Sequence, residues 1–269
     1  MSFIAAAVQM TSGNNKRENI KKAENLLKRG VDLGAKILSL PENFSFIGSE
    51  GEVTAESEDV ESGESAEFLR SFASKYGVWL VGGSIPVKAD GGKIFNTSLL
   101  VNENGEISGK YNKIHLFDVD LAGGETHRES DYVEKGKTSV PFDSPFGKIG
   151  LSVCYDLRFP ELYLSLALDG ARLVFVPAAF TLETGKDHWE TLLRARAIEN
   201  QLYIIAPAQF GTHNKKRKTY GNSMIVDPWG KVIARASDKE TVVIAEIDPS
   251  YQDEIRKRIP CLQHHLLKN

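Results

Sequence analysis

Short apolar runs alternate with longer amphipathic stretches through the first half of the chain. Residues 3–9 and 36–40 have the composition of buried strands, and residues 14–32 between them repeat apolar side chains at helical spacing. Because strands alternate with helices early and cluster late, the pattern predicts an α/β fold whose sheets each have one face covered by helices. The same periodicity predicts helices at 62–76, 160–168 and 187–201, the last capped by Asp187, and strands at 78–85, 95–101, 106–111, 148–153, 173–177, 202–208, 221–227, 231–236 and 241–247.

Two stretches lack regular periodicity. Residues 112–148 hold Gly123-Gly124 and two prolines among many polar residues, which indicates a long functional loop. Residues 49–64 are acidic and are predicted to form a surface loop. No segment has the Gly/Ser-rich or Pro-rich composition of a linker, so residues 1–269 are predicted to form a single domain.

Composition and charge place the chain among ordinary globular proteins. Hydrophobic residues make up 41% and charged residues 26% of the 269, and the net charge is −3. This balance calls for neither nucleic acid nor an anionic membrane surface as a partner, and no apolar run reaches the roughly 18 residues of a membrane span. Only two cysteines are present, Cys154 and Cys261, which favours a reducing compartment. We therefore expect a cytoplasmic protein.

Cys154 stands where a predicted strand meets a predicted helix. Residues 149–153 are apolar or small, and Pro160 suits the first turn of the helix that follows. A nucleophile at such an elbow is pushed out of the sheet, and the backbone N–H groups after it can stabilise an oxyanion. Cys154 is therefore a candidate nucleophile, although a free cysteine in an apolar strand also fits a small buried core residue.

Two charged residues also follow predicted strands closely. Glu42 comes after residues 36–40, where a carboxylate can act as general base if burial raises its pKa toward neutrality. Lys113 follows the strand at 106–111, and a fixed cation near Cys154 would favour the thiolate and stabilise a developing oxyanion. Taken singly, each also fits an ordinary exposed side chain.

Three separated blocks give these residues a common context. They are PEN at 41–43, YNKIHLF at 111–117 and CYDLRFPE at 154–161. In this order they resemble the signature blocks of the nitrilase superfamily of carbon–nitrogen hydrolases. The resemblance extends over nearly the whole chain and includes HWE at 188–190, RARAIEN at 194–200 and VDPWG at 226–230. It implies a four-layer α-β-β-α sandwich that needs no metal or organic cofactor.

The resemblance implies a reaction through a thioester. Cys154 attacks the carbon of a small linear amide while Glu42 takes its proton as general base. Lys113 and the backbone N–H of Tyr155 hold the oxyanion. Ammonia then leaves, and a water molecule activated by Glu42 completes the hydrolysis.

The family often has a second glutamate in the loop after the lysine. By position, Glu129 matches it and is expected to orient Lys113 or the substrate. Glu125 and Glu134 are neighbouring alternatives.

Further segments resemble two branches of the superfamily, the deaminated-glutathione amidases and the ω-amidases. They are residues 113–121, 180–189 and 213–230. Both branches act on the amide of an acidic molecule, so the expected substrate carries a carboxylate, with deaminated glutathione first and 2-oxoglutaramate second. Arg158, Phe180 and Thr184 fall where the family binds the carboxylate end, and a guanidinium has the planar fork that fits it.

Several alternatives remain open at this stage. Arg158 also fits an ion pair with Glu161 or Asp156, and the basic run at 215–218 fits a solvated surface as well as an anion-attracting one. Acyl transfer to an amine would use the same thioester. A Cys–His pair or a metal site at His264-His265 lacks the motif or ligand spacing that each requires.

The resemblance also implies a homodimer. Family members commonly pack through the helix after the cysteine and through the C-terminal region. The tail departs from that pattern at residues 263–266, where an Arg-Arg pair is usual and His265-Leu266 stands instead.

Overall fold

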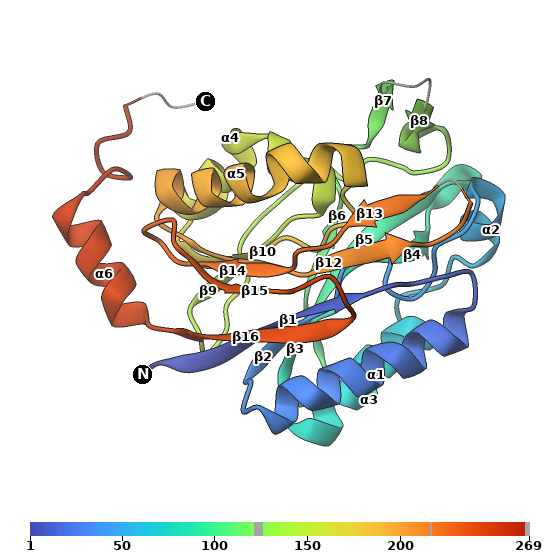
Figure 1. Ribbon diagram of the computed structural model, residues 1–269, viewed down its shortest axis with the longest axis horizontal. Helices are drawn as coiled ribbons and strands as arrows, with labels where there is room; N and C mark the ends of the chain where they lie inside the picture. The colour runs from blue at the N-terminus through green and yellow to red at the C-terminus, as the bar shows by residue number, and fades with distance from the viewer. Residues whose placement is uncertain (121–125, 216, 267–269) are drawn as a thin grey trace.

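A computed structural model of the protein describes residues 1–120, 126–215 and 217–266, which form a four-layer sandwich (Figure 1). Two β-sheets pack face to face in the middle. Helices α1 (Lys16–Asp32) and α3 (Glu64–Tyr76) cover the outer face of the first sheet, and helices α4 (Pro160–Leu168) and α5 (Leu182–Asn200) cover the outer face of the second. The predicted α-β-β-α architecture is confirmed.

The first sheet is mixed and is built around β1 (Phe3–Met10). This strand pairs in parallel with β2 and β12 and antiparallel with β16. The order is β13-β12-β1-β2-β3-β5-β4, with β16 paired to β1 and β6 paired to β5. The other strands of this sheet are β2 (Ile37–Ser39), β3 (Trp79–Val81), β4 (Ile85–Lys88), β5 (Ile94–Val101), β6 (Ile107–Asn112), β12 (Ala208–Thr212), β13 (Lys218–Tyr220) and β16 (Thr241–Ile247).

The second sheet is smaller and has the order β15-β14-β11-β10-β9. Its three adjacent strands β9, β10 and β11 are parallel, and β14 and β15 extend it in antiparallel fashion. The strands are β9 (Lys148–Leu151), β10 (Ala171–Phe175), β11 (Tyr203–Ala206), β14 (Met224–Val226) and β15 (Val232–Arg235).

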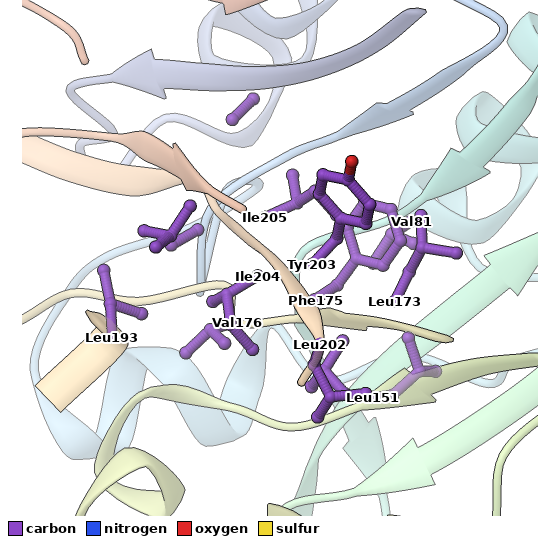
Figure 2. Packing of buried hydrophobic residues seen from close by; sticks show 14 of the residues in the cluster. Val81, Leu151, Leu173, Phe175, Val176, Leu193, Leu202, Tyr203, Ile204 and Ile205 are labelled. Atoms are coloured by element: carbon purple, nitrogen blue, oxygen red, sulfur yellow. The ribbon is translucent and has the colours of Figure 1, made fainter. Parts of the chain in front are cut away.

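The side-chain alternation of β1 explains why this sheet is covered on both faces. Ala5 and Ala7 belong to the core between the two sheets, whereas Ala6 and Val8 belong to the core under α1 and α3. Figure 2 shows part of the inter-sheet core, where Val81 of β3 lies among side chains of the second sheet that include Phe175. Both faces of the strand pack against a core and carry apolar side chains, so residues 3–8 read as one continuous apolar run.

Two predicted strands are each split in the structure. The run at 78–85 breaks after β3, because Gly83 has a φ of 56° and a Cβ there would lie 2.1 Å from the carbonyl oxygen of Pro41. The run at 202–208 breaks at Pro207, where the chain leaves β11 of the second sheet and enters β12 of the first. Proline has no N–H for a ladder, so it suits this passage between sheets.

Other elements depart from the sequence prediction. Residues 49–64 contain a short helix, α2 (Glu50–Ala55), and are not wholly a loop. Helix α5 begins at Leu182 and is capped by Thr181, so Asp187 lies inside the helix and is not its cap. The strand β13 and the helix α6 (Pro249–Arg258) were not predicted, and residues 112–148 contain the hairpin β7 (Asp118–Asp120) and β8 (Thr126–Arg128).

The helices also bear on membrane association. None of those in the described part of the chain has the length and apolar character that a membrane crossing requires.

Candidate active site

Three strand ends meet at one cavity. Glu42 follows β2 and Lys113 follows β6 in the first sheet, and Cys154 follows β9 in the second. All three side chains, together with Glu129, line a cavity of about 490 Å³. The cavity therefore lies where the edges of the two sheets come together, and it has the size typical of a small-molecule site.

Cys154 opens a short 3₁₀ turn, η3 (Cys154–Arg158), directly after β9. Its φ is 48°, in the left-handed region, where holding a residue other than glycine costs on the order of 1–3 kcal/mol. Its own backbone N–H donates to the carbonyl of Pro177 at 2.9 Å. The N–H groups of a first helical turn have no acceptor within that turn, so the N–H of Tyr155 remains for a ligand. The elbow expected at Cys154 is present.

Lys113 lies between two carboxylates. Its Nζ donates to Oε1 of Glu42 at 3.1 Å and to Oε2 of Glu129 at 2.7 Å. The side chain is only 2% exposed, so both contacts are shielded from water. Nζ also donates to Oε1 of Glu129 at 3.0 Å, so its three N–H donors all have carboxylate acceptors, and an oxyanion would replace one of the two Glu129 contacts.

Glu42 is held by the loop that follows β2. Its backbone carbonyl accepts a hydrogen bond from Nε2 of Gln209 at 3.0 Å, and the next residue, Asn43, has a φ of 54°. The backbone N–H of Asn43 donates to Oγ of Ser84 at 3.1 Å. Since Gly83 lets the backbone of this loop approach closely, the Gly82-Gly83-Ser84 break between β3 and β4 fixes the position of Glu42.

Asn96 of β5 joins the two glutamates, and sequence reasoning missed it. Its Nδ2 donates to Oε1 of Glu42 at 3.0 Å and to Oε1 of Glu129 at 3.3 Å. The residue is buried and stands on the strand next to β6, which carries Lys113 at its end. No local motif marks it, because the contact depends on the pairing of β5 with β6.

Asp156 is the second residue that sequence reasoning missed as part of the site. It is fully buried and accepts hydrogen bonds from the hydroxyl of Tyr111 at 2.7 Å and from the backbone amides of His115 and Val153 at 3.1 and 2.8 Å. One carboxylate thus ties the loop that carries Lys113 to the turn that carries Cys154. The signal was available in the block at 154–161, where Asp156 follows the cysteine by two residues.

The buried charges set the protonation state of the site. Burial raises the pKa of Glu42, but the charges of Lys113 and Arg217 and a hydrogen bond from Cys154 outweigh it and hold this pKa below its ordinary value. Burial lowers the pKa of Lys113, but Glu129 and Glu42 raise it well above its usual range. Burial and the charge of Glu42 raise the pKa of the Cys154 thiol well above its usual range.

Of the two electrostatic expectations from the sequence, the condition set for Glu42 is not met, and the one for Lys113 is right in direction. The pKa of Glu42 is lowered and not raised toward neutrality, because two cations act on it. Lys113 favours the thiolate by lowering the pKa of the Cys154 thiol, as expected, but burial and the charge of Glu42 raise this pKa by more. The resting site holds a thiol hydrogen-bonded to an ionised carboxylate, which is the arrangement needed for proton transfer during nucleophilic attack.

The remaining predicted residues line the same cavity. The guanidinium carbon of Arg158 lies over the rings of Tyr155 and Phe180, 5.7 and 5.3 Å from their centroids, and its Nη1 lies 3.2 Å from Nδ1 of His188. Thr184 lies in the first turn of α5 at the cavity wall. Within the described ranges Arg158 has no carboxylate partner, so the expected alternative of an ion pair at the helix start is wrong.

The other candidates lie outside this cluster. Glu134 is not part of the described cavity wall, and Glu125 lies outside the described residues. Cys261 is exposed in the segment after α6. His264 and His265 are near it, and among the described residues no group of three His, Cys, Asp or Glu side chains is arranged to hold a metal ion.

Comparison with known proteins agrees with this arrangement. The carbon-nitrogen hydrolase family matches residues 4–257. A deaminated glutathione amidase of Synechocystis sp. is 45% identical over 268 residues, which cover 98% of each chain. The crystal structure of the Caenorhabditis elegans NitFhit protein has a TM-score of 0.92 at 41% identity and covers 98% of this chain, which spans 65% of that one. Saccharomyces cerevisiae Nit3, of branch 10 of the nitrilase superfamily, has a TM-score of 0.88 at 34% identity, with 96% and 94% covered.

A four-layer sandwich with a buried cysteine, lysine and glutamates at its strand ends defines a hydrolase of carbon–nitrogen bonds. The chain belongs to the carbon–nitrogen hydrolase family of the nitrilase superfamily, as the sequence blocks predicted. It is an amidohydrolase that acts on C–N bonds.

Proposed function

We propose that the protein hydrolyses the amide bond of deaminated glutathione, the 2-oxo acid that replaces glutathione when its α-amino group is lost. The observation that carries this proposal is the composition of the cavity wall. Besides the cluster around Cys154, the wall includes the cationic side chains of Arg158, Arg217 and Lys218. Cationic walls suit a substrate with a carboxylate at each end. Similarity to deaminated glutathione amidases over nearly the whole chain supports the same substrate.

The proposed reaction has two halves. In the first, the Cys154 thiol gives its proton to Glu42 as Sγ bonds to the amide carbon, and Lys113 and the N–H of Tyr155 hold the oxyanion. The C–N bond then breaks as Glu42 returns the proton to nitrogen. In the second half, Glu42 takes a proton from water, whose oxygen bonds to the thioester carbon. The C–S bond breaks, and that proton restores the thiol. Glu129 keeps Lys113 in place throughout.

The leaving group depends on the amide. In deaminated glutathione the amide nitrogen belongs to cysteinylglycine, so this dipeptide is the leaving group and no ammonia forms. The other product, released when the thioester is hydrolysed, is a 2-oxo dicarboxylate. Ammonia, which the sequence analysis expected, forms only from a primary amide such as 2-oxoglutaramate. An assay for the released 2-oxo acid detects both substrates, whereas an ammonia assay detects only the second.

Transfer of the acyl group to an added amine is the alternative reaction of the same thioester. It would appear as a new amide at the expense of the acid.

Arg158 is proposed to bind the carboxylate of the 2-oxo acid end. Its guanidinium makes cation–π contacts with two aromatic rings that line the cavity and has no carboxylate partner among the described residues. We expect Arg158→Ala to lower kcat/KM for deaminated glutathione by about ten- to a hundredfold, because a charge-assisted bidentate contact is lost. The measurement compares the free 2-oxo acid with its methyl ester in both enzymes.

The ester separates this role from a general defect. Arg158→Ala should leave the ester's rate nearly unchanged, and Arg194→Ala, on the exposed side of α5, should leave both rates unchanged. Equal rates for acid and ester in the wild-type enzyme would contradict a carboxylate-binding pocket.

Asn96 is proposed to position the two glutamates. We expect Asn96→Ala to lower kcat by about tenfold or more with little change in KM, because both carboxylates lose a shared donor and small displacements of reacting groups are costly. Asn102→Ala, at the other end of the same β-hairpin, is a matched control. It removes turn hydrogen bonds and should lower the melting temperature without lowering kcat. If Asn96→Ala lowered the melting temperature and left kcat unchanged, Asn96 would be a purely structural residue.

We further propose a single-domain homodimer that works in the cytoplasm. Exposed apolar side chains support a dimer, since Leu168 at the end of α4 and Ile198 on α5 are 51% and 49% exposed. Sedimentation at the mass of one chain would contradict it. Two cysteines without a disulfide in the described residues suit a reducing compartment.

A further inference from the structure

The hairpin formed by β12 and β13 brings a second cationic side chain to the cavity. Arg217 lies in the connection just before β13, is half-buried, and lines the same cavity as Cys154. Lys218 follows it at the cavity wall. Within residues 1–120, 126–215 and 217–266, no carboxylate is in ion-pair contact with Arg217, so its charge is available to a ligand.

Arg217 and Arg158 come from different elements that line the same cavity. The guanidinium of Arg158 lies over Tyr155 and Phe180, on the side of the η3 turn and α5. Arg217 belongs to the β12–β13 hairpin, which also holds Glu42, because Nε2 of Gln209 on β12 donates to the Glu42 carbonyl at 3.0 Å. The charge of Arg217 accordingly lowers the pKa of Glu42. Two cations from different elements can bind two separate anionic groups of one ligand.

The chemistry decides which end of the substrate lies near Arg217. Glu42 must pass a proton to the departing nitrogen, so that nitrogen lies within hydrogen-bond reach of its carboxylate. Whatever is attached to the nitrogen then continues from the Glu42 side of the cavity. The acyl part stays bonded to Cys154 and extends toward Arg158.

The base of the hairpin is firmly held. His213 lies within 2.7 Å of the Ser12 carbonyl through Nδ1 and within 2.7 Å of Oγ1 of Thr219 through Nε2. Burial lowers the pKa of His213 to about 4, so the neutral ring donates to the carbonyl and accepts from the hydroxyl at working pH. The amide of Tyr220 donates to the carbonyl of Phe180 at 3.0 Å. These contacts fix the strand ends between which Arg217 stands.

We propose that Arg217, with Lys218 beside it, binds the terminal carboxylate of the amine leaving group and so selects peptide amides over primary amides. The inference rests on the proposed function and extends it, because it assigns the leaving-group half of the substrate. A primary amide such as 2-oxoglutaramate has no group to place there. The free carboxylate of a dipeptide gains a charge-assisted contact with the guanidinium.

The test measures kcat/KM for three substrates in three enzymes. The substrates are deaminated glutathione, its C-terminal carboxamide and 2-oxoglutaramate, and the released 2-oxo acid is the common readout. The enzymes are the wild type, Arg217→Gln and the control Lys215→Gln, which changes an exposed residue of the same hairpin outside the described cavity wall. Because the changed side chains are on a loop, folding is checked by melting temperature.

We expect Arg217→Gln to lower kcat/KM for deaminated glutathione by about tenfold or more, mainly through KM, as loss of a charge-assisted contact predicts. The carboxamide and 2-oxoglutaramate should change by less than about twofold. Lys215→Gln should change none of the three.

Each other outcome has a definite meaning. An equal loss on all three substrates would overturn the proposal, because Arg217 would then act through the charge of Glu42. No loss on deaminated glutathione would also overturn it, because the side chain would be a solvated cation. A wild-type enzyme inactive on all three would overturn the proposed function, and the leaving-group site with it.

Discussion

Replacing Cys154 by alanine is expected to lower kcat by at least about a thousandfold, because the thioester cannot form without the nucleophile. The substitution removes one sulfur atom from a cavity wall, so the fold should persist. It also removes a hydrogen bond to Glu42, whose charge stays neutralised by Lys113. The measurement is release of the 2-oxo acid from deaminated glutathione, with the melting temperature as the check on folding.

Cys261 gives the matched control for this substitution. It is the other free thiol, is exposed, and lies far along the chain after α6. Cys261→Ala should keep wild-type kcat. Activity near wild type in a folded Cys154→Ala protein would contradict the entire thioester mechanism.

Local sequence signals are enough to place the ends of strands at this site. The apolar run before Glu42, the strand before Lys113 and the elbow at Cys154 each appear in the structure where the pattern predicted them. Each side chain comes directly after a strand or within a few residues of one. Glu42 and Lys113 follow strands of the first sheet, which share an edge, whereas Cys154 follows a strand of the second. The strand signals alone therefore bring the first two together, and the resemblance of the three blocks was needed to add the cysteine.

Contacts that depend on strand pairing could not be predicted from the local sequence pattern. Asn96 reaches both glutamates only because β5 pairs with β6, and nothing in its neighbours marks that register. The break at Gly83 depends on a backbone 42 positions earlier in the chain, at Pro41. The net pKa shifts of Glu42 and Cys154 could not be predicted for the same reason, because they depend on all the charges that surround each buried group.

Replacing Glu42 by glutamine is expected to lower kcat by at least about a hundredfold, since an amide cannot take the proton of the thiol or return it to nitrogen. Glutamine has nearly the same shape, so the hydrogen bond from Asn96 can persist. Glu134→Gln is the matched control, because Glu134 is half-buried in the same region but lies outside the described cavity wall. A larger loss of kcat in the Glu134 variant would indicate that Glu134, and not Glu42, is the general base.

The pH dependence gives this prediction a second, independent readout. Glu42 acts as base only when ionised, and its pKa lies below the ordinary 4.5, so wild-type kcat/KM should fall only as pH drops through that acidic range. Lys113 stays charged far into the alkaline range because its pKa is raised, so no loss from it is expected at neutral pH. In Glu42→Gln the thiol has no internal base, and its pKa lies well above neutrality in the wild-type site. The residual rate should therefore rise with pH as thiolate forms, whereas the wild-type rate stays level. A residual rate that does not depend on pH would contradict a base role for Glu42.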